Sequence, residues 1–444
     1  MPEDVPPRQT IALPRGCWCG STSYNLAFPP AVSGGYFVGV IPQDDVVITG
    51  WGCVSPLGGD APTTWAALMR GESARGEITC IPVEGCRVTQ GAEAHLPELS
   101  GVSKKEVSRL SRASRLAIPA ARQAMAVAGI LDDNGRSVFS RLELSMSTTA
   151  CGMEHGEAFL RDICSGNTRH LASKISRYPA HQQIGDLQQH LGFSGPSMIV
   201  SNACASGANA IGHAADLLRA GFADIVLAGG YEALCELVFC GFDSLQALDP
   251  DLCKPFGLHR RGLMLGEGAA FLVMETSAHA NHRGAKIKGR LAGYGHTTDT
   301  HHITQPDPTG GPLEGAIHRA LQQAGLKPSE IGYLNAHGTA TVFNDGAEAA
   351  AFARVFAEDL ATVRISSTKA AIGHTLGAAG SLEAVFALEC LRTGDIPPQI
   401  NTTHPIPELA ASLARPGDKL TKPAVLSVNL GFGGSNAALV FTAA

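Results

Sequence analysis

The chain has 444 residues, of which 44% are hydrophobic and 17% charged, so it is long and apolar enough to bury a large core. Its formal net charge of −6 does not suggest a nucleic-acid partner. No signal peptide or apolar run of membrane length is present, which predicts a cytoplasmic protein without a membrane segment. The 12 cysteines follow no repeating spacing, which indicates reduced thiols.

Residues 1–45 differ in composition from the rest of the chain. They are rich in Pro and Gly and sparse in Lys and Arg, which predicts a flexible or loosely docked extension. Cys17 and Cys19 have the spacing of half a metal site, but no matching pair follows, and we expect no metal.

The ordered fold is expected to alternate strands and helices from residue 46 onward. Short apolar runs predict buried strands at 46–50, 142–148, 198–200, 224–230, 269–275, 286–293 and 331–335, and a pair of strands within 424–441. Helical patterns cover 111–129, 205–219 and 313–325. Pro119 should kink or break the first of these helices.

Two helices poor in bulky residues resemble each other. Ala205-Ser206-Gly207 is followed, fourteen residues after its Gly, by Leu-Arg-Ala-Gly, and Ala378-Ala379-Gly380 is followed at the same interval by Leu-Arg-Thr-Gly. Both end at a glycine that suits a helix C-terminus. Helices with so little bulk are usually buried and closely approached, so the echo indicates duplicated halves whose central helices pack together.

Cys204 lies between the strand expected at 198–200 and the helix expected at 205–219. At such an elbow, free backbone N–H groups and the helix dipole favour a thiolate. The small neighbours Ala203, Ala205, Ser206 and Gly207 leave room for a carbonyl to reach the sulfur. A buried core cysteine is the alternative interpretation of this position alone.

Two histidines lie in turns at the ends of predicted elements. His337 directly follows the strand at 331–335, within Asn-Ala-His-Gly-Thr-Ala-Thr, and His374 begins Gly-His-Thr-Leu-Gly-Ala-Ala-Gly at the mouth of the second small-residue helix. Either histidine alone is more often structural. Together with Cys204 they indicate nucleophilic catalysis through a thiol.

Four motifs, in this order, resemble those of the β-ketoacyl-[acyl-carrier-protein] synthases of the elongating, two-histidine type, within the thiolase superfamily. They are Ala-Cys-Ala-Ser-Gly at Cys204, His-Gly-Thr-x-Thr at His337, Lys369 with the Gly-His-Thr-x-Gly-Ala-Ala-Gly run, and Gly-Phe-Gly-Gly-Ser-Asn at 431–436. The resemblance covers about residues 46–442.

The resemblance implies an α/β thiolase fold, with duplicated halves in a five-layered α-β-α-β-α arrangement. The first half, 46–285, would carry the cysteine, and the second, 286–444, the two histidines. The implied reaction is a decarboxylative Claisen condensation with malonyl-carrier extender, in fatty acid or polyketide biosynthesis. The implied partners are an acyl carrier protein, whose phosphopantetheine arm presents the substrate, and a second subunit, identical or ketosynthase-like. No bound cofactor is expected.

Roles follow from the motifs by position. Cys204 would be the nucleophile, and His337 and His374 would bind the extender carbonyl and assist decarboxylation. The N–H groups of Cys204 and Phe432 would form the oxyanion hole, with Phe432 as a mobile gate. Lys369 would pair with Glu348. The substrate-binding residues would be Thr339 and Thr341, on the phosphopantetheine arm, with Ser206, Gly431 and Gly433.

One loop departs from the family pattern. Where the family has acidic residues, this chain has Gly257 and Arg261, so the loop's hydrogen bonding should differ and substrate preference with it. A non-catalytic chain-length-factor subunit is the alternative function, and the retained Cys204 argues against it. Initiating synthases and thiolases use other residue sets, which the two histidine motifs disfavour.

Overall fold

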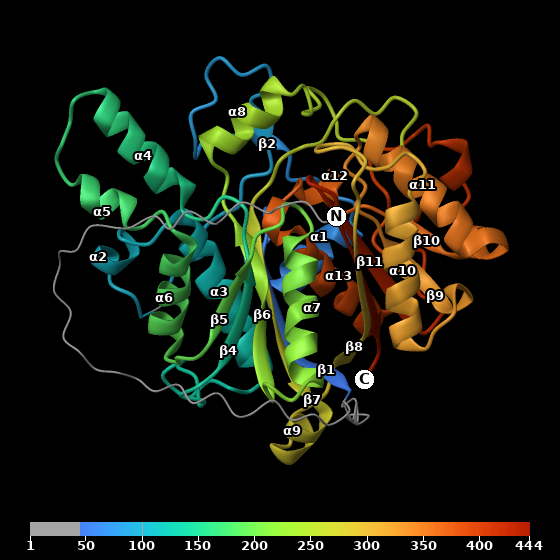
Figure 1. The fold of residues 1–444 in the computed structure, drawn as a ribbon, viewed down its shortest axis with the longest axis horizontal. Coiled ribbons are helices and arrows are strands. Elements are labelled where there is room, and N and C mark those ends of the chain that lie inside the picture. Colours follow the sequence, from blue (N-terminus) through green and yellow to red (C-terminus); the bar gives the residue numbers. More distant parts are fainter. Residues whose placement is uncertain (1–44, 100) are drawn as a thin grey trace, which may run out of the picture. The chain divides into compact units, whose positions relative to one another are not determined.

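The computed structural model describes residues 45–99 and 101–444. The predicted extension at 1–45, with Cys17 and Cys19, therefore lies almost entirely outside the described residues. Within the described ranges, ten strands form one mixed sheet, and two short strands, β2 (Gly76–Glu77) and β3 (Gln90–Gly91), form a second (Figure 1). The large sheet organises the fold.

Five strands of the large sheet come from the first part of the chain. They are β1 (Val46–Val54), β4 (Glu143–Ser147), β5 (Ser197–Val200), β6 (Ile225–Glu232) and β7 (Gly268–Thr276). Their order across the sheet is β1-β7-β6-β4-β5. Strands β4, β5 and β6 are parallel, whereas β7 is antiparallel to both of its neighbours.

The other five strands repeat this arrangement. They are β8 (Gly289–Thr298), β9 (Ile331–Asn335), β10 (Arg364–Ser366), β11 (Ala424–Gly431) and β12 (Ser435–Thr442), in the order β8-β12-β11-β9-β10. Again three strands are parallel and β12 is antiparallel to its neighbours. Numbered within its own half, each set runs first-fifth-fourth-second-third. This repeat supports our proposed boundary between residues 285 and 286, just before β8.

Helices cover the sheet in three layers. α3 (Arg112–Val127) and α6 (Ala180–Leu191) pack on the outer face of the first half, and α10 (Gly311–Ala324) and α11 (Val342–Phe356) on that of the second. α7 (Ser206–Arg219) and α13 (Ala379–Thr393) lie between the inner faces of the two halves (Figure 1). The predicted α-β-α-β-α thiolase fold is confirmed.

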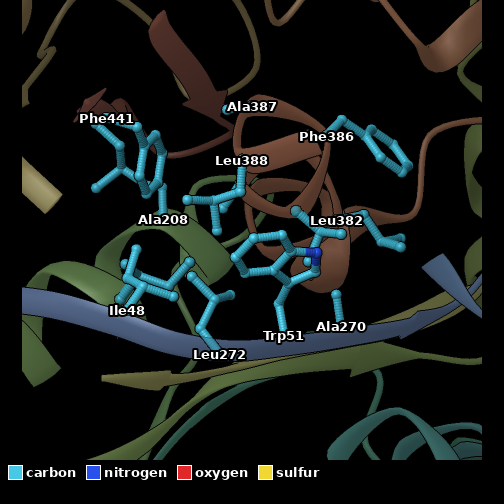
Figure 2. Close-up of a cluster of buried hydrophobic side chains, with 14 of the residues drawn as sticks. Ile48, Trp51, Ala208, Ala270, Leu272, Leu382, Phe386, Ala387, Leu388 and Phe441 are labelled. Atoms are coloured by element: carbon cyan, nitrogen blue, oxygen red, sulfur yellow. The ribbon is translucent and has the colours of Figure 1, made fainter. Parts of the chain in front are cut away.

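The middle layer confirms the predicted contact between the two small-residue helices. A Cβ on Gly207 would lie 2.7 Å from the backbone N of Ser381, and one on Gly380 would lie 2.4 Å from the backbone N of Ala208. Figure 2 shows Ala208 of α7 and Leu388 of α13 near Trp51 of β1, within this buried apolar layer. The helices approach so closely because glycine occupies both contact positions.

The remaining helices are short or lie around this framework. The α-helices are α1 (Ala61–Met69), α2 (Lys104–Val107), α4 (Met153–Cys164), α5 (Leu171–Ile175), α8 (Glu236–Ser244), α9 (Ser277–His282) and α12 (Lys369–Ile372). The 3₁₀ turns are η1 (Pro328–Glu330), η2 (Ala357–Thr362), η3 (Leu376–Ala378) and η4 (Pro407–Leu409). None of the helices in the described ranges is long and apolar enough to cross a bilayer.

Two local predictions need correction. Pro119 was expected to kink or break its helix, and the break is absent, because α3 continues through it to Val127. This helix packs on β1 so closely that a Cβ on Gly50 would lie 2.3 Å from the carbonyl oxygen of Ala124, and this packing outweighs the local cost of proline. β5 is not buried, since it forms an edge of the sheet and Met198 is 48% exposed.

Candidate active site

The cysteine lies at a sharp turn that the local sequence holds in place. β5 ends at Val200 and α7 begins at Ser206, with Ala203 in the left-handed region at φ +57°. The Ser206 hydroxyl donates to the Ala203 carbonyl oxygen at 2.5 Å and accepts from the Asn202 backbone N–H at 2.8 Å. The turn therefore presents Cys204 at the N-terminus of a buried helix.

Burial keeps the sulfur protonated in the free protein. The Cys204 side chain is almost fully buried, and desolvation raises the pKa of its thiol to about 12. The charge of Lys369 and the backbone N–H groups of Phe432 and of Cys204 itself act in the opposite direction on this pKa. The backbone N–H groups at the helix N-terminus thus act in the direction expected from the sequence, but desolvation is the larger effect on this pKa.

Backbone hydrogen bonds hold both histidine turns. Glu348, from α11, accepts from the backbone N–H of His337 at 2.7 Å and of Gly338 at 2.6 Å. The His374 turn pairs with a neighbouring strand-like segment, through its N–H to the Met264 carbonyl at 2.6 Å. These bonds fix the backbone turns from which the two imidazoles project.

These turns bring the thiol and both imidazoles together. Donor atoms of Cys204, His337 and His374 all lie within 4.8 Å of one another. The two imidazole rings meet edge to face, with their centroids 5.2 Å apart at 86°. Burial, together with the charge of Lys369, holds the pKa of each imidazole well below its usual range. Both rings are therefore neutral near pH 7, and each has an N–H to donate.

The same three donors have the number and type of a zinc site. However, the Lys369 ammonium that lowers both histidine pKa values also repels a metal cation. The positive charge of Lys369 therefore disfavours a metal cation at these three donors.

The predicted pairing of Lys369 with Glu348 was wrong. Lys369, which is 1% exposed, donates instead to Glu383 Oε1 at 2.5 Å, and Asn429 donates to the other oxygen of Glu383 at 2.6 Å. Glu348 is occupied by the backbone of the His337 turn and by the Asn344 amide. Burial and the nearby Asp345 raise the pKa of Glu348 to about 8.

Sequence reasoning missed two buried glutamates. Glu383 interrupts the otherwise small and apolar start of α13, and a charge in such a helix is the signal that it has a partner. Glu232, at the end of β6, accepts from the backbone N–H groups of Ala150 at 2.8 Å and Gly377 at 2.9 Å. It ties the turn after His374 to the first half of the fold.

A cavity of about 400 Å³ reaches the three reactive groups. Of the predicted substrate-binding residues, Thr339, Thr341 and Gly431 line it, and the two threonine hydroxyls lie 2.9 Å apart. Ser206 and Gly433 are not among its lining residues. Ser206 is fully buried and uses its hydroxyl on the Cys204 turn, so its predicted substrate contact is not supported.

Phe432 also lines this cavity. Its ring is 40% exposed and stacks on Phe242 of α8, with centroids 5.7 Å apart. The preceding Gly431 lies against the nucleophile turn, where an added Cβ would be 3.3 Å from the Cys204 backbone N. This glycine allows the Phe432 N–H to approach the sulfur.

The altered loop has its own hydrogen bonds. Arg260 donates to the backbone carbonyls of Thr341 at 3.2 Å and Val342 at 2.9 Å, and so supports the threonine motif. Arg261 lines the cavity, is half-exposed, and forms ion pairs with Asp249 and Asp251. A basic residue thus borders the cavity where the family pattern has an acidic one.

Two family models match the chain in succession. Residues 43–280 match the beta-ketoacyl synthase N-terminal domain, and residues 288–403 match the C-terminal domain. The chain belongs to the β-ketoacyl synthase family. The β-ketoacyl synthases of this family are condensing acyltransferases. The convergence of Cys204, His337 and His374 fits that chemistry.

Individual relatives agree with this assignment. The chain is 34% identical to a "3-oxoacyl-[acyl-carrier-protein] synthase 2" of Staphylococcus aureus (strain COL), over 89% of this chain and 97% of the relative. It is 37% identical to "Nodulation protein E" of Rhizobium sp. (strain N33), over 89% and 98%. Among solved structures, "The ishigamide ketosynthase/chain length factor" superposes with a TM-score of 0.83 at 30% identity, over 90% of this chain and 100% of that one.

Proposed function

We propose that this β-ketoacyl synthase condenses an acyl group, held on Cys204, with a malonyl unit held on an acyl carrier protein. The observation that carries the proposal is the meeting of one thiol and two neutral imidazoles at the end of a cavity. The named similarity to a 3-oxoacyl-[acyl-carrier-protein] synthase supports the choice of carrier. The pathway is fatty acid or polyketide biosynthesis in the cytoplasm.

In the first half-reaction, the sulfur attacks the carbonyl carbon of the acyl thioester. A thiol whose pKa is about 12 reacts slowly alone, so a neighbouring neutral imidazole takes its proton as the bond forms. The carbonyl oxygen becomes an oxyanion that accepts from the N–H groups of Cys204 and Phe432. The carrier thiolate then departs with the proton, leaving an acyl thioester on Cys204.

In the second half-reaction, the malonyl thioester takes the place of the departed carrier. His337 and His374 donate N–H hydrogen bonds to its thioester oxygen, which stabilises the enolate formed as CO₂ leaves. The α-carbon of the enolate attacks the acyl carbonyl, the carbon–sulfur bond to Cys204 breaks, and the released thiolate takes up a proton. Neutral imidazoles suit this role because they need not lose a proton to stabilise the enolate.

The remaining residues position the substrates. Thr339 and Thr341, side by side on the cavity wall, would hydrogen-bond the phosphopantetheine arm. Phe432 would move aside to connect acyl and extender sites. Lys369 with Glu383, and Glu348 with the His337 turn, would act as positioning residues. The assembly is a dimer, with an identical or a ketosynthase-like partner.

A chain-length-factor role is the second candidate, because one of the similar structures pairs a ketosynthase with a chain length factor. Incubating the purified protein with acyl-carrier and malonyl-carrier thioesters separates the two functions. We expect the β-ketoacyl-carrier product and one CO₂ for each acyl group consumed. Product absent under all acyl chain lengths, with no acyl group on Cys204, would favour the non-catalytic role.

A further inference from the structure

Two cysteines outside the proposed catalytic machinery lie in contact. Cys86 is in the loop between β2 and β3, Cys240 is in α8, and their sulfur atoms are 3.3 Å apart. Both are free and partly exposed, so a small reagent can reach them. α8 and β2 also lie beside each other in Figure 1.

Hydrogen bonds already hold these two segments together. The Asp243 carboxylate, three residues after Cys240, accepts from the backbone N–H of Arg87 at 2.7 Å and of Val88 at 3.2 Å. The Arg87 guanidinium donates to the Leu248 carbonyl at 2.6 Å. The residues next to both thiols are thus fixed, and closing 3.3 Å to a disulfide bond requires only a small movement.

We propose that Cys86 and Cys240 form a reversible disulfide that fastens α8 to the 78–89 loop and restrains the cavity wall beside Cys204. The oxidant is a low-molecular-weight disulfide such as glutathione disulfide. One thiolate attacks it and releases one small thiol, and the second cysteine then attacks the mixed disulfide and releases the other. Two protein thiols lose two hydrogens, and one small disulfide becomes two small thiols.

The restraint reaches the site through α8. Phe242, two residues after Cys240, stacks on Phe432. Phe242 also lines the cavity, together with Leu245 and Gln246, which follow α8. Cys204 itself belongs to the same apolar cluster as Val88 and Phe239. A covalent link at Cys240 therefore limits movement of the part of α8 on which Phe432 stacks. We expect turnover to slow as a result, and this expectation depends on the proposed function.

The first experiment measures the bond. The full chain is equilibrated with glutathione disulfide and glutathione at several ratios, quenched with acid, and analysed by intact and peptide mass. We expect a loss of two hydrogens and a cross-linked pair of peptides carrying Cys86 and Cys240, reversed by a dithiol. Cys86→Ala and Cys240→Ser should lose the cross-link, whereas Cys164→Ser, at an exposed cysteine of α4, should keep it. Absence of this cross-link at every ratio overturns the proposal.

The second experiment measures the consequence without requiring condensation. The rate at which N-ethylmaleimide alkylates Cys204 should fall about threefold or more on oxidation, because the cavity wall moves less. In the Cys86→Ala variant, Cys204 should be alkylated at the same rate under reducing and oxidising conditions. This rate should equal that of the unmodified protein before oxidation. A cross-link that leaves this rate unchanged, or an oxidative slowing that persists in Cys86→Ala, overturns the proposed restraint. If alkylation slows but no condensation occurs even when reduced, the proposed function fails and this inference stands.

Discussion

The duplicated halves place equivalent helices, α7 and α13, at the same point of the same topology, but use their N-termini differently. α7 opens on Cys204 and keeps one partly exposed face. α13 is buried without interruption from Ala379 to Cys390, follows the His374 turn, and contains the buried carboxylate of Glu383. In the proposed mechanism, one half supplies the nucleophile, and the other supplies two imidazoles that burial and the charge of Lys369 keep neutral.

The difference shows what duplication contributes to such a site. The glycines at 207 and 380 bring the two helix N-termini into contact, so groups from the two halves meet without long loops. In the proposed mechanism, Cys204 of the first half attacks the acyl group and the histidines of the second half stabilise the enolate, so substitutions in the two halves should impair different half-reactions.

The largest expected effect breaks the first half's contribution. Cys204→Ser should reduce acyl transfer below detection, since a serine hydroxyl is far harder to ionise than a thiol. Transfer from a radiolabelled acyl carrier thioester measures it, with Cys164→Ser as the control at an exposed cysteine. Acyl transfer by the Cys204→Ser variant at the unmodified rate would contradict the assignment of the nucleophile.

The second largest effect is expected from removing the buried charge of Lys369 in the second half. Lys369→Met leaves Glu383 unpaired and should lower the free energy of unfolding by about 3–5 kcal/mol, measured by chemical denaturation. Lys369→Met with Glu383→Leu should recover most of this loss, because no charge is then left buried. Arg70→Ala, which breaks an exposed pair with Glu72, should leave the midpoint nearly unchanged. If Lys369→Met and Arg70→Ala lower the free energy of unfolding equally, the ion pair of Lys369 with Glu383 does not contribute the expected stability.

A pH series sharpens the contrast between helix N-terminus and burial. The pKa of the Cys204 thiol is raised to about 12, so the reactive thiolate should increase about tenfold per pH unit above neutrality. Alkylation of Cys204 by iodoacetamide should therefore keep rising with pH, while that of free cysteine levels off near its pKa of about 8.5. A plateau for Cys204 below pH 9 would show that the imidazoles hold a thiolate.

The smallest expected effect concerns the contact between the helices. Gly380→Ala should cost about 1–3 kcal/mol of unfolding free energy, because the new Cβ would lie 2.4 Å from the Ala208 backbone N. Gly185→Ala in α6 is the matched control, since nothing lies within 4 Å of its Cβ position, and it should be neutral or slightly stabilising. If the two variants are equally stable, α7 and α13 can move apart to accept the new Cβ at little cost, and their close contact does not depend on glycine at position 380.

Much of the fold was predictable because its signals are local. Apolar runs marked the buried strands, and the repeated small-residue helices marked the duplication of the two halves. The motif histidines and Cys204 were predictable because their turns follow recognisable elements. The exposed edge of β5 was not, since an edge strand with an apolar sequence has the same pattern as a buried one.

What remained hidden depends on contacts between distant residues. Whether Lys369 pairs with Glu348 or Glu383 depends on where the N–H groups of the His337 turn lie, and spacing along the chain carries no such information. The thiol pKa likewise depends on burial by both halves, which outweighs the local helix dipole. The thiol pair at 86 and 240, 154 residues apart, is of the same kind.

The different roles proposed for the two halves are tested most directly by following the mass of the acyl group on Cys204 through one turnover. Unmodified protein, His337→Ala and His374→Ala are first mixed with acyl carrier thioester, and malonyl carrier is then added. We predict that all three gain the acyl mass on Cys204, with at least one histidine variant gaining it more slowly because an imidazole takes the thiol proton. The loss of this mass after malonyl carrier is added should fall much further in both histidine variants, by about a hundredfold or more. Histidine variants that fail equally at gaining and losing the acyl group would contradict the account, because the imidazoles would then serve mainly to activate the sulfur.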